Sequence, residues 1–401
     1  MRNYLICLLL LVFLAPASAQ NAAKAGLSTV GLERYGDWLE REIAEGRIPM
    51  AEALIYRNGE IGYHELLGTE NLGTGTALGK DRIFHLMSMT KPIVSVAFMM
   101  LYEEGHFQLN DKVSKYLPEF KDLRVARNDS TGIAVASDPV EQEITIAQVM
   151  SHTAGFSHGL GGTKLDNEIA GALYFRPQAD IAARVNTLAG LPLVAEPGTK
   201  WYYSASPDIL SRLIEVFSGM TTLEFLQQRL FDPLGMKDTG YNIPAENTAR
   251  LVTSHEIGNS GLAVAGRQLP STGNTIYGGT HGLYSTAKDY LQFCRMLLNQ
   301  GELDGRRYLS RKTVEMMTAN HVGDLIGNGW GFGLGFGVVV DVPATGIIGS
   351  EGQYYWSGAY STYFFIDPKE NMISILLSQR SPYSGYHSDM MRQMVYQAIG
   401  D

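Results

Sequence analysis

The sequence predicts a mixed α/β (α+β) fold, in which strands from both ends of the chain form one antiparallel sheet flanked by helices, and the middle forms a mainly helical lobe. Three observations predict it: strand patterns occur near both ends, helical and turn-rich segments lie between them, and 45% of the 401 residues are hydrophobic while 18% are charged. This composition suits a globular chain with a large core. We expect residues 20–401 to form one domain, with an α/β lobe at about 20–109 and 266–401 and a helical lobe at about 110–265.

The N-terminal segment MRNYLICLLLLVFLAPASAQ has the pattern of a secretory signal peptide. It combines a basic residue at Arg2, an apolar run at residues 4–14 and the small-residue triplet Ala17-Ser18-Ala19. The alternative is a membrane anchor, but the run is shorter than the about 20 residues that a membrane-spanning helix needs. We expect cleavage near Ala19 and a secreted or periplasmic mature protein without a membrane segment. Cys294 is then the one remaining cysteine, so no intrachain disulfide is expected.

The first sheet strands follow a helical pattern at residues 33–46. AEALIYR at 51–57 has a strand pattern, and Asn58-Gly59 is typical of a two-residue hairpin turn. EIGYHELLG at 60–68 is the expected partner strand. An almost wholly apolar helix is expected to follow, within HLMSMTKPIVSVAFMMLYEEG.

Strand patterns return near the C-terminus. GWGFGLGFGVVVDV at 329–342 alternates glycine with large residues, which predicts a strand. AYSTYFFID at 359–367 and NMISILLSQ at 371–379 predict a second hairpin, with its turn at 368–370. Residues 388–399 have a helical pattern, so the sheet is expected to be covered by helices from both ends of the chain.

Two Ser-x-x-Lys spacings occur, and their contexts differ. Ser285 and Lys288 open an amphipathic helix, where we expect Ser285 to be the N-cap and Lys288 to be solvated. Ser88 and Lys91 precede a long run without charged residues, and Pro92 is tolerated only in the first turn of a helix. This spacing therefore places Ser88 at, or just before, the N-terminus of a buried helix.

A lysine at i+3 shares a helix face with the serine at i. Because the run after Lys91 is apolar, we expect Lys91 to be buried rather than solvated, and burial disfavours the ammonium form. A neutral amine beside a hydroxyl can accept its proton. The pair Ser88 and Lys91 therefore predicts a nucleophile with its base.

Several longer segments resemble one known family and occur in that family's order. They are FHLMSMTKPIVSVAFMMLYEEG, LNDKVSKYLPEF, VMSHTAGF, PGTKWYYSASPDIL, GLYSTAKDYLQFCRMLLNQGELDGRRYLS and WSGAYSTYFFIDPKENMISILLSQ. The chain resembles the serine β-lactamase and penicillin-binding-protein superfamily, most of all the branch of class C β-lactamases and family VIII carboxylesterases. The resemblance implies a β-lactamase/DD-peptidase-like fold, one catalytic domain, no cofactor and hydrolysis through an acyl-enzyme.

The same resemblance implies the site residues. Ser88 matches the acylated nucleophile and Lys91 its base. In WYYSAS, Tyr203 matches the family's proton-shuttling tyrosine, expected to be tyrosinate-like, and Tyr202 is the weaker candidate. The amides of Ser88 and Ala359 are expected to form the oxyanion hole.

Two departures from the family pattern bear on the substrate. Trp356-Ser357-Gly358 matches the K-T-G triplet, so Trp356 replaces a lysine that helps lactamases bind a carboxylate, and Ala205 replaces the asparagine of Y-x-N. Tyr354, Tyr355 and Trp356 instead offer an aromatic wall suited to an apolar acyl or alkoxy group, and Tyr355 and the triplet are expected to bind the substrate. We therefore expect a small-molecule carboxylic ester as substrate. The alternatives are a β-lactamase or D-amino-acid peptidase, and a non-catalytic penicillin- or peptide-binding protein.

Other patterns point away from competing functions. Residues 155–159 fit G-x-S-x-G, but a helical pattern precedes them and a glycine-rich loop follows, where the motif requires a strand and a helix. His152 is expected to fasten a loop by hydrogen bonding, and His281 to line the site. The histidines are scattered without metal-ligand spacing, so no metal is expected, and the net charge of −9 argues against nucleic-acid partners.

Overall fold

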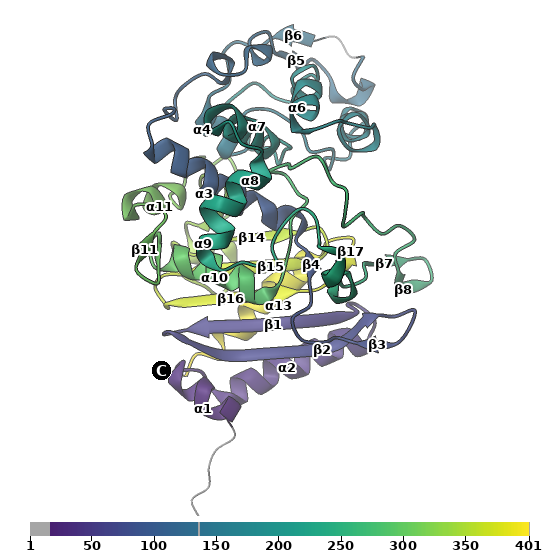
Figure 1. Ribbon diagram of the computed structural model, residues 1–401, viewed down its shortest axis with the longest axis vertical. Coiled ribbons are helices and arrows are strands. Elements are labelled where there is room, and N and C mark those ends of the chain that lie inside the picture. Colours follow the sequence, from purple (N-terminus) through teal and green to yellow (C-terminus); the bar gives the residue numbers. More distant parts are fainter. Residues whose placement is uncertain (1–16, 135–136, 401) are drawn as a thin grey trace, which may run out of the picture.

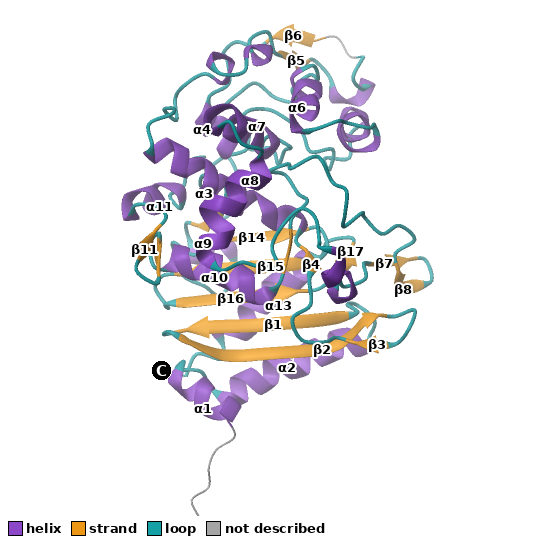
Figure 2. Cartoon of the chain, viewed as in Figure 1, coloured by secondary structure: helices purple, strands orange, loops and turns teal. Residues whose placement is uncertain are grey.

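The protein is described here by a computed structural model, which describes residues 17–134 and 137–400. In the described part of the chain, eight strands form one antiparallel sheet in the order β12-β13-β14-β15-β16-β1-β2-β3. Figures 1 and 2 show this sheet with helices packed around it, and a lobe made mainly of helices and loops above it. The predicted fold class is confirmed, because the N-terminal strand β1 pairs directly with the C-terminal strand β16.

The strands of this sheet come from both ends of the chain. They are β1 (Met50–Arg57), β2 (Glu60–Asn71), β3 (Thr76–Ala77), β12 (Trp330–Phe332), β13 (Gly337–Val339), β14 (Tyr354–Gly358), β15 (Thr362–Asp367) and β16 (Met372–Leu377).

Both predicted hairpins are present. Asn58 and Gly59 have φ of 55° and 91°, the two positive values that a type I′ turn requires between β1 and β2. β15 and β16 form the second hairpin, across residues 368–371. The single strand expected at 329–342 is wrong: the segment contains the two short strands β12 and β13, which pair with each other. Gly335, with φ 98°, lies in the turn between them, where a Cβ atom would meet the Ser95 hydroxyl.

The outer face of the sheet is covered by helices from both ends of the chain (Figure 1). They are α1 (Ala17–Lys24), α2 (Thr29–Ala44) and α13 (Gly385–Tyr396). Trp38 and Leu39 of α2 share a buried cluster with Ile55 and Phe365 of the sheet and Met391 of α13. The predicted apolar core of the signal peptide lies outside the described residues.

Three helices lie on the other side of the sheet, between it and the helical lobe or beside them. They are α3 (Thr90–Glu103), α10 (Ala287–Leu298) and α11 (Arg311–Met317). α10 contacts β15 and β16, and α3 contacts α7 of the lobe. Cys294 on α10 is fully buried, as its amphipathic pattern predicts.

The second Ser-x-x-Lys differs from the prediction in one respect. Thr286, not Ser285, caps α10: its hydroxyl accepts a hydrogen bond from the Asp289 N–H at 3.1 Å. Ser285 is buried one residue earlier, in the short strand β9 (Tyr284–Ser285), where its hydroxyl pairs with that of Thr239. Lys288 is exposed, as expected, and forms an ion pair with a surface aspartate.

The helical lobe is built from short helices joined by loops. Its α-helices are α4 (Ile146–Met150), α5 (Lys164–Ala170), α6 (Ile181–Ala189), α7 (Pro207–Ser218), α8 (Thr222–Leu226) and α9 (Asp232–Leu234), with π-helical turns η5 (Gly171–Phe175) and η6 (Gln227–Phe231). The lobe boundaries remain a prediction. In the range assigned to this lobe, β7 (His255–Gly258) pairs with β8 (Gly261–Val264) on one side and with β17 (Arg380–Ser381), near the C-terminus, on the other.

The remaining elements are short connections between these parts. They are β4 (Phe84–His85), β5 (Arg124–Ala126), β6 (Ser137–Pro139), β10 (Glu302–Leu303), β11 (Arg306–Arg307), α12 (Val342–Thr345), and the 3-10 turns η1 (Met87–Met89), η2 (Val113–Lys115), η3 (Pro118–Phe120), η4 (Asp129–Thr131) and η7 (Ala245–Arg250).

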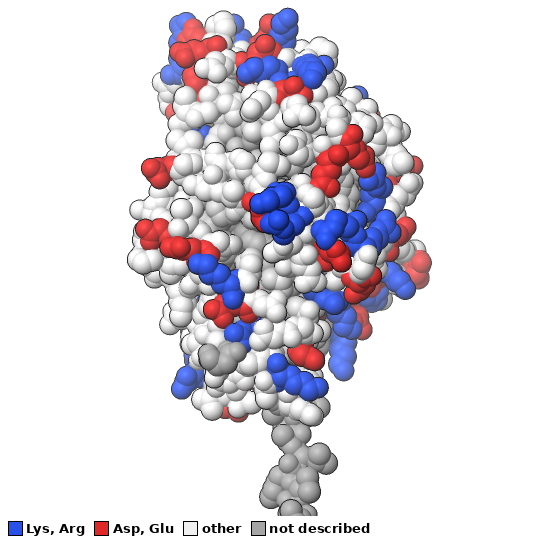
Figure 3. Space-filling model, turned by 90° about the vertical axis from the view of Figure 1, so that its left-hand side faces the viewer, with Lys and Arg blue, Asp and Glu red and all other residues white. Residues whose placement is uncertain are grey.

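Two surface properties bear on possible partners. Among the described residues, no helix is both long enough and apolar enough to cross a bilayer. Figure 3 shows one face of the molecule, on which basic and acidic side chains are interspersed, with uncharged surface between them.

Candidate active site

Ser88 lies at the junction that the sequence predicts. It is the middle residue of η1, and α3 begins two residues later, with Pro92 in its first turn. Met87, directly before it, has φ of 51°, a left-handed conformation that costs a non-glycine residue free energy. Ser88 is partly exposed, whereas the residues of α3 from Thr90 to Leu101 are buried. The hydroxyl therefore lies at the accessible end of a buried helix.

Lys91 is buried beside Ser88. Its side chain is 1% exposed, and its Nζ lies 3.1 Å from Ser88 Oγ and 2.8 Å from the carbonyl oxygen of Thr280. Burial lowers the pKa of Lys91 well below its usual value, and the negative charge of Asp208 opposes this shift only in part. A neutral amine that donates one N–H to Thr280 can direct its lone pair at the Ser88 hydroxyl.

Tyr203 adjoins this pair. Lys91 Nζ lies 4.5 Å from the centroid of its ring. Burial raises the pKa of the Tyr203 phenol, and the nearby Ser88 and Trp356 side chains lower it to a smaller extent. No described residue reaches hydrogen-bonding geometry with Tyr203 Oη. Burial therefore favours the protonated phenol in the free protein, in contrast to the tyrosinate-like state that the resemblance implies.

Tyr202, the weaker candidate, is directed elsewhere. Its hydroxyl donates to Asp166, with Oη 3.0 and 3.1 Å from the two carboxylate oxygens. The same carboxylate accepts from the hydroxyl of Ser157, which also accepts from the Gly159 N–H at 2.8 Å. The serine of G-x-S-x-G therefore fastens a loop, and α4 precedes it where a nucleophile elbow requires a strand.

The strand β14 brings the predicted triplet to Ser88. β14 contacts η1, and Gly358 approaches it so closely that a Cβ atom there would lie 2.2 Å from the carbonyl oxygen of Leu86. Ala359 follows directly, near the Ser88 segment, where an oxyanion hole would need its amide. The roles of Ser357 and of the two amides remain predictions.

Trp356 forms an aromatic wall next to Tyr203. Its ring centroid lies 5.4 Å from that of Tyr203 and 5.2 Å from that of Phe332. Its indole N–H has no partner among the described residues.

Tyr355 does not join this wall. Successive strand residues point to opposite faces, and the Tyr355 ring packs under the Arg392 guanidinium, 4.3 Å from its centroid, in the outer-face cluster.

Three histidines lie beside the reacting groups: the ring of His152 is 5.1 Å from that of Tyr203, and His158 and His281 lie nearby. His152 shares hydrogen bonds with the side chains of Ser204, at 2.9 Å, and Ser206, at 3.3 Å, which fits the predicted loop-fastening role. His281 follows Thr280 in the chain. His158 stacks on the Tyr203 ring with centroids 5.2 Å apart, and sequence reasoning missed it. The available signal for His158 was its position inside G-x-S-x-G, a motif that its sequence context argues against.

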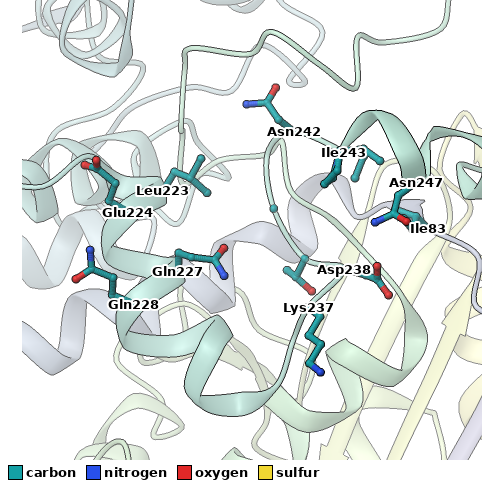
Figure 4. A pocket seen from close by; sticks show the side chains of 13 residues that line it. Ile83, Leu223, Glu224, Gln227, Gln228, Lys237, Asp238, Asn242, Ile243 and Asn247 are labelled. Atoms are coloured by element: carbon teal, nitrogen blue, oxygen red, sulfur yellow. The ribbon is translucent and has the colours of Figure 1, made fainter.

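A hollow elsewhere in the molecule is separate from this site. A cavity of about 320 Å³ lies between the α8–η6 segment and residues 237–247. Figure 4 shows side chains that line it. Neither Ser88, Lys91 nor Tyr203 lines it. Within residues 17–134 and 137–400, no group of three or more His, Cys, Asp or Glu side chains is arranged to hold a metal ion.

The chain is similar to known proteins over most of its length. The Beta-lactamase family model matches residues 36–398. Esterase EstB of Burkholderia gladioli is 28% identical over 392 residues, which cover 89% of this chain and 93% of EstB. Lovastatin esterase of Penicillium rubens is 29% identical over 350 residues, which cover 79% of this chain and 85% of that enzyme.

A solved structure supports the fold. EstCE1, described as a hydrolase with promiscuous acyltransferase activity, superposes with a TM-score of 0.77. The superposition covers 95% of this chain and 100% of EstCE1, at 24% sequence identity. At this identity the likeness shows a shared fold.

Proposed function

The chain belongs to the β-lactamase family, and we propose that it is a serine hydrolase that cleaves carboxylic esters through an acyl-enzyme on Ser88. The observation that carries the proposal is the buried amine of Lys91, 3.1 Å from the Ser88 hydroxyl. The esterase relatives support the same reaction class. The requirements of this chemistry are a nucleophile, a base within hydrogen-bond reach and an acid for the leaving group.

In the proposed reaction, Ser88 Oγ attacks the ester carbonyl carbon while Lys91 accepts the hydroxyl proton. The carbonyl oxygen becomes an oxyanion, which the amides of Ser88 and Ala359 would stabilise. The bond to the alkoxy oxygen then breaks, and the protonated Tyr203 phenol gives its proton to that oxygen. Lys91 returns a proton to Tyr203. Water releases the acid by the reverse proton transfers and restores Ser88.

The protonated state of Tyr203 fits the role of acid. Burial raises the pKa of the phenol, so the proton is available when the alkoxide leaves. Burial lowers the pKa of Lys91, so the amine is able to act as base at a pH below its usual range. The directions of these two pKa shifts favour a neutral amine for the attack of Ser88 and a protonated phenol for the departure of the alkoxide.

The aromatic wall next to Tyr203 favours an ester over a lactam as the substrate. Trp356 stands where the family's lactamases have a lysine, and its neighbours Phe332 and Tyr203 are aromatic. This surface suits an apolar acyl or alkoxy group and offers no cation to a substrate carboxylate.

The test compares hydrolysis of p-nitrophenyl acetate and butyrate by wild type and by Ser88→Ala. The matched control is Ser285→Ala, in the second Ser-x-x-Lys. We expect Ser88→Ala to lose turnover and Ser285→Ala, when folded, to retain it. Equal rates in wild type and Ser88→Ala would remove Ser88 from the mechanism.

Two further measurements address the alternatives. Nitrocefin turnover much faster than ester turnover would favour a β-lactamase or peptidase. Mass spectrometry after treatment with a fluorophosphonate probe should show Ser88 labelled. An unlabelled Ser88 would favour a non-catalytic binding protein.

We also propose that the protein is exported and loses residues 1–19. The basic, apolar and small-residue regions of that segment support this proposal. Intact-mass analysis of protein from a secretory host should give a chain that begins at Gln20. A chain that retains Met1 would contradict it.

A further inference from the structure

We propose that His158, Tyr174 and His281 form a polar subsite that binds a neutral hydrogen-bonding group, such as a hydroxyl or carboxamide, on the ester substrate. The inference rests on the proposed esterase function and specifies its substrate class. It uses three side chains to which the mechanism gives no role.

The three rings lie together beside the reacting groups. His158 and Tyr174 have centroids 5.4 Å apart, Tyr174 and His281 5.2 Å, and His158 and His281 6.5 Å. His158 also stacks on Tyr203 at 5.2 Å. His281 directly follows Thr280, whose carbonyl oxygen accepts the hydrogen bond from Lys91. The cluster therefore adjoins the nucleophile's base and acid.

The polar atoms of His158 and Tyr174 lack partners among the described residues. His158 is 9% exposed, and neither of its ring nitrogens has a hydrogen bond to any described residue. The buried Tyr174 hydroxyl is likewise unpaired within the described chain. A buried unpaired polar group costs about 1–3 kcal/mol, so native proteins retain few of them. Three such atoms in adjacent rings at a candidate active site indicate a place where a ligand supplies the partners.

The local backbone agrees with a functional role. Tyr174 belongs to η5, a π-helical turn at residues Gly171–Phe175, which continues directly from α5. Single π-turns within helices occur frequently at functional sites. This turn carries the Tyr174 hydroxyl to the cluster.

The charge state of the cluster selects a neutral ligand group. Burial lowers the pKa of His158, and burial together with the Arg184 charge lowers the pKa of His281 to about 3. Burial raises the pKa of Tyr174. Arg184 lies over the Tyr174 ring, but its charge faces Asp208 at 3.5 Å. The cluster therefore offers uncharged donors and acceptors, which suit a hydroxyl or amide rather than a carboxylate.

The experiment measures preference between isosteric esters that differ only in one hydroxyl. On the acyl side, p-nitrophenyl 2- and 3-hydroxybutyrate are compared with 2- and 3-methylbutyrate. On the alcohol side, 2-hydroxyethyl butyrate is compared with propyl butyrate. Each ratio of kcat/KM is divided by the ratio of the uncatalysed rates. A site built to hydrogen-bond a hydroxyl discriminates strongly against the analogue that lacks it, so we expect wild type to prefer at least one hydroxy ester by about tenfold or more.

Two variants and a control test whether the proposed subsite causes this preference. His158→Phe keeps the stacked ring and removes both nitrogens, and Tyr174→Phe removes only the hydroxyl. Each should reduce the preference to within about twofold while turnover of the methyl esters persists. Tyr386→Phe, on the exposed part of α13, is the control and should leave the ratio unchanged.

The outcomes separate this inference from the proposed function. Turnover of all esters without preference in wild type would overturn the subsite, as would a preference that survives in both His158→Phe and Tyr174→Phe. If no ester is hydrolysed in a reaction that depends on Ser88, the proposed function itself is overturned.

Discussion

The substitution Gly358→Ala tests the contact that joins the sheet to the nucleophile. An added Cβ atom would lie 2.2 Å from the Leu86 carbonyl oxygen and 2.2 Å from the Thr362 hydroxyl. An ordinary contact of about 3.4 Å requires a displacement of about 1.2 Å, which must separate β14 from the segment that carries Ser88. The atom that the added Cβ would meet in Leu86 belongs to the backbone, two residues before Ser88. The displacement therefore cannot be absorbed by rotation of a side chain.

A displacement of about 1 Å at a reacting centre costs about 100-fold in rate, so we expect kcat for p-nitrophenyl butyrate to fall by about that factor. The overpacking should also lower the free energy of unfolding by about 1–3 kcal/mol, measured by urea denaturation. The matched control is Gly385→Ala, where a Cβ atom meets nothing within 4 Å. A folded Gly358→Ala with kcat within about threefold of wild type would refute the placement of this strand at the reaction centre.

Three further predictions concern buried groups. Because burial lowers the pKa of Lys91, this side chain takes up a proton on unfolding at any pH between its lowered pKa and the ordinary lysine pKa of 10.5, so the stability of wild type should rise with pH relative to that of Lys91→Met. Urea unfolding at pH 7 and 9.5 measures this difference in stability. A difference that does not change with pH would contradict the prediction. Asp208→Ala leaves the buried Arg184 charge unpaired and should cost about 3–5 kcal/mol in the same assay, whereas a loss below about 1 kcal/mol would show that the pair is solvated. Ser157→Ala should lose about 1–3 kcal/mol of stability but keep ester turnover per folded molecule; loss of turnover at full stability would restore G-x-S-x-G as a catalytic motif.

Local patterns were enough to predict much of the fold. Asn58-Gly59 specifies its hairpin because both residues tolerate positive φ. Pro92 and the uncharged run after it place Ser88 and Lys91 at the start of an apolar helix, because a proline restricts its own turn and the run is a property of consecutive residues. Where a competing side chain lay one position away, as with Thr286 beside Ser285, the pattern gave the helix but not its cap.

The amino-acid sequence by itself determined the strand and helix order, the family resemblance, and Ser88, Lys91 and Tyr203 as the residues to examine. Only the tertiary structure decided which neighbours they have. It turned Tyr355 to the outer face, raised the pKa of the Tyr203 phenol through burial, and brought His158 against the Tyr203 ring. The physical reason is that burial and ring contacts depend on segments far apart in the chain, whereas turns, caps and helix starts depend on residues a few positions apart.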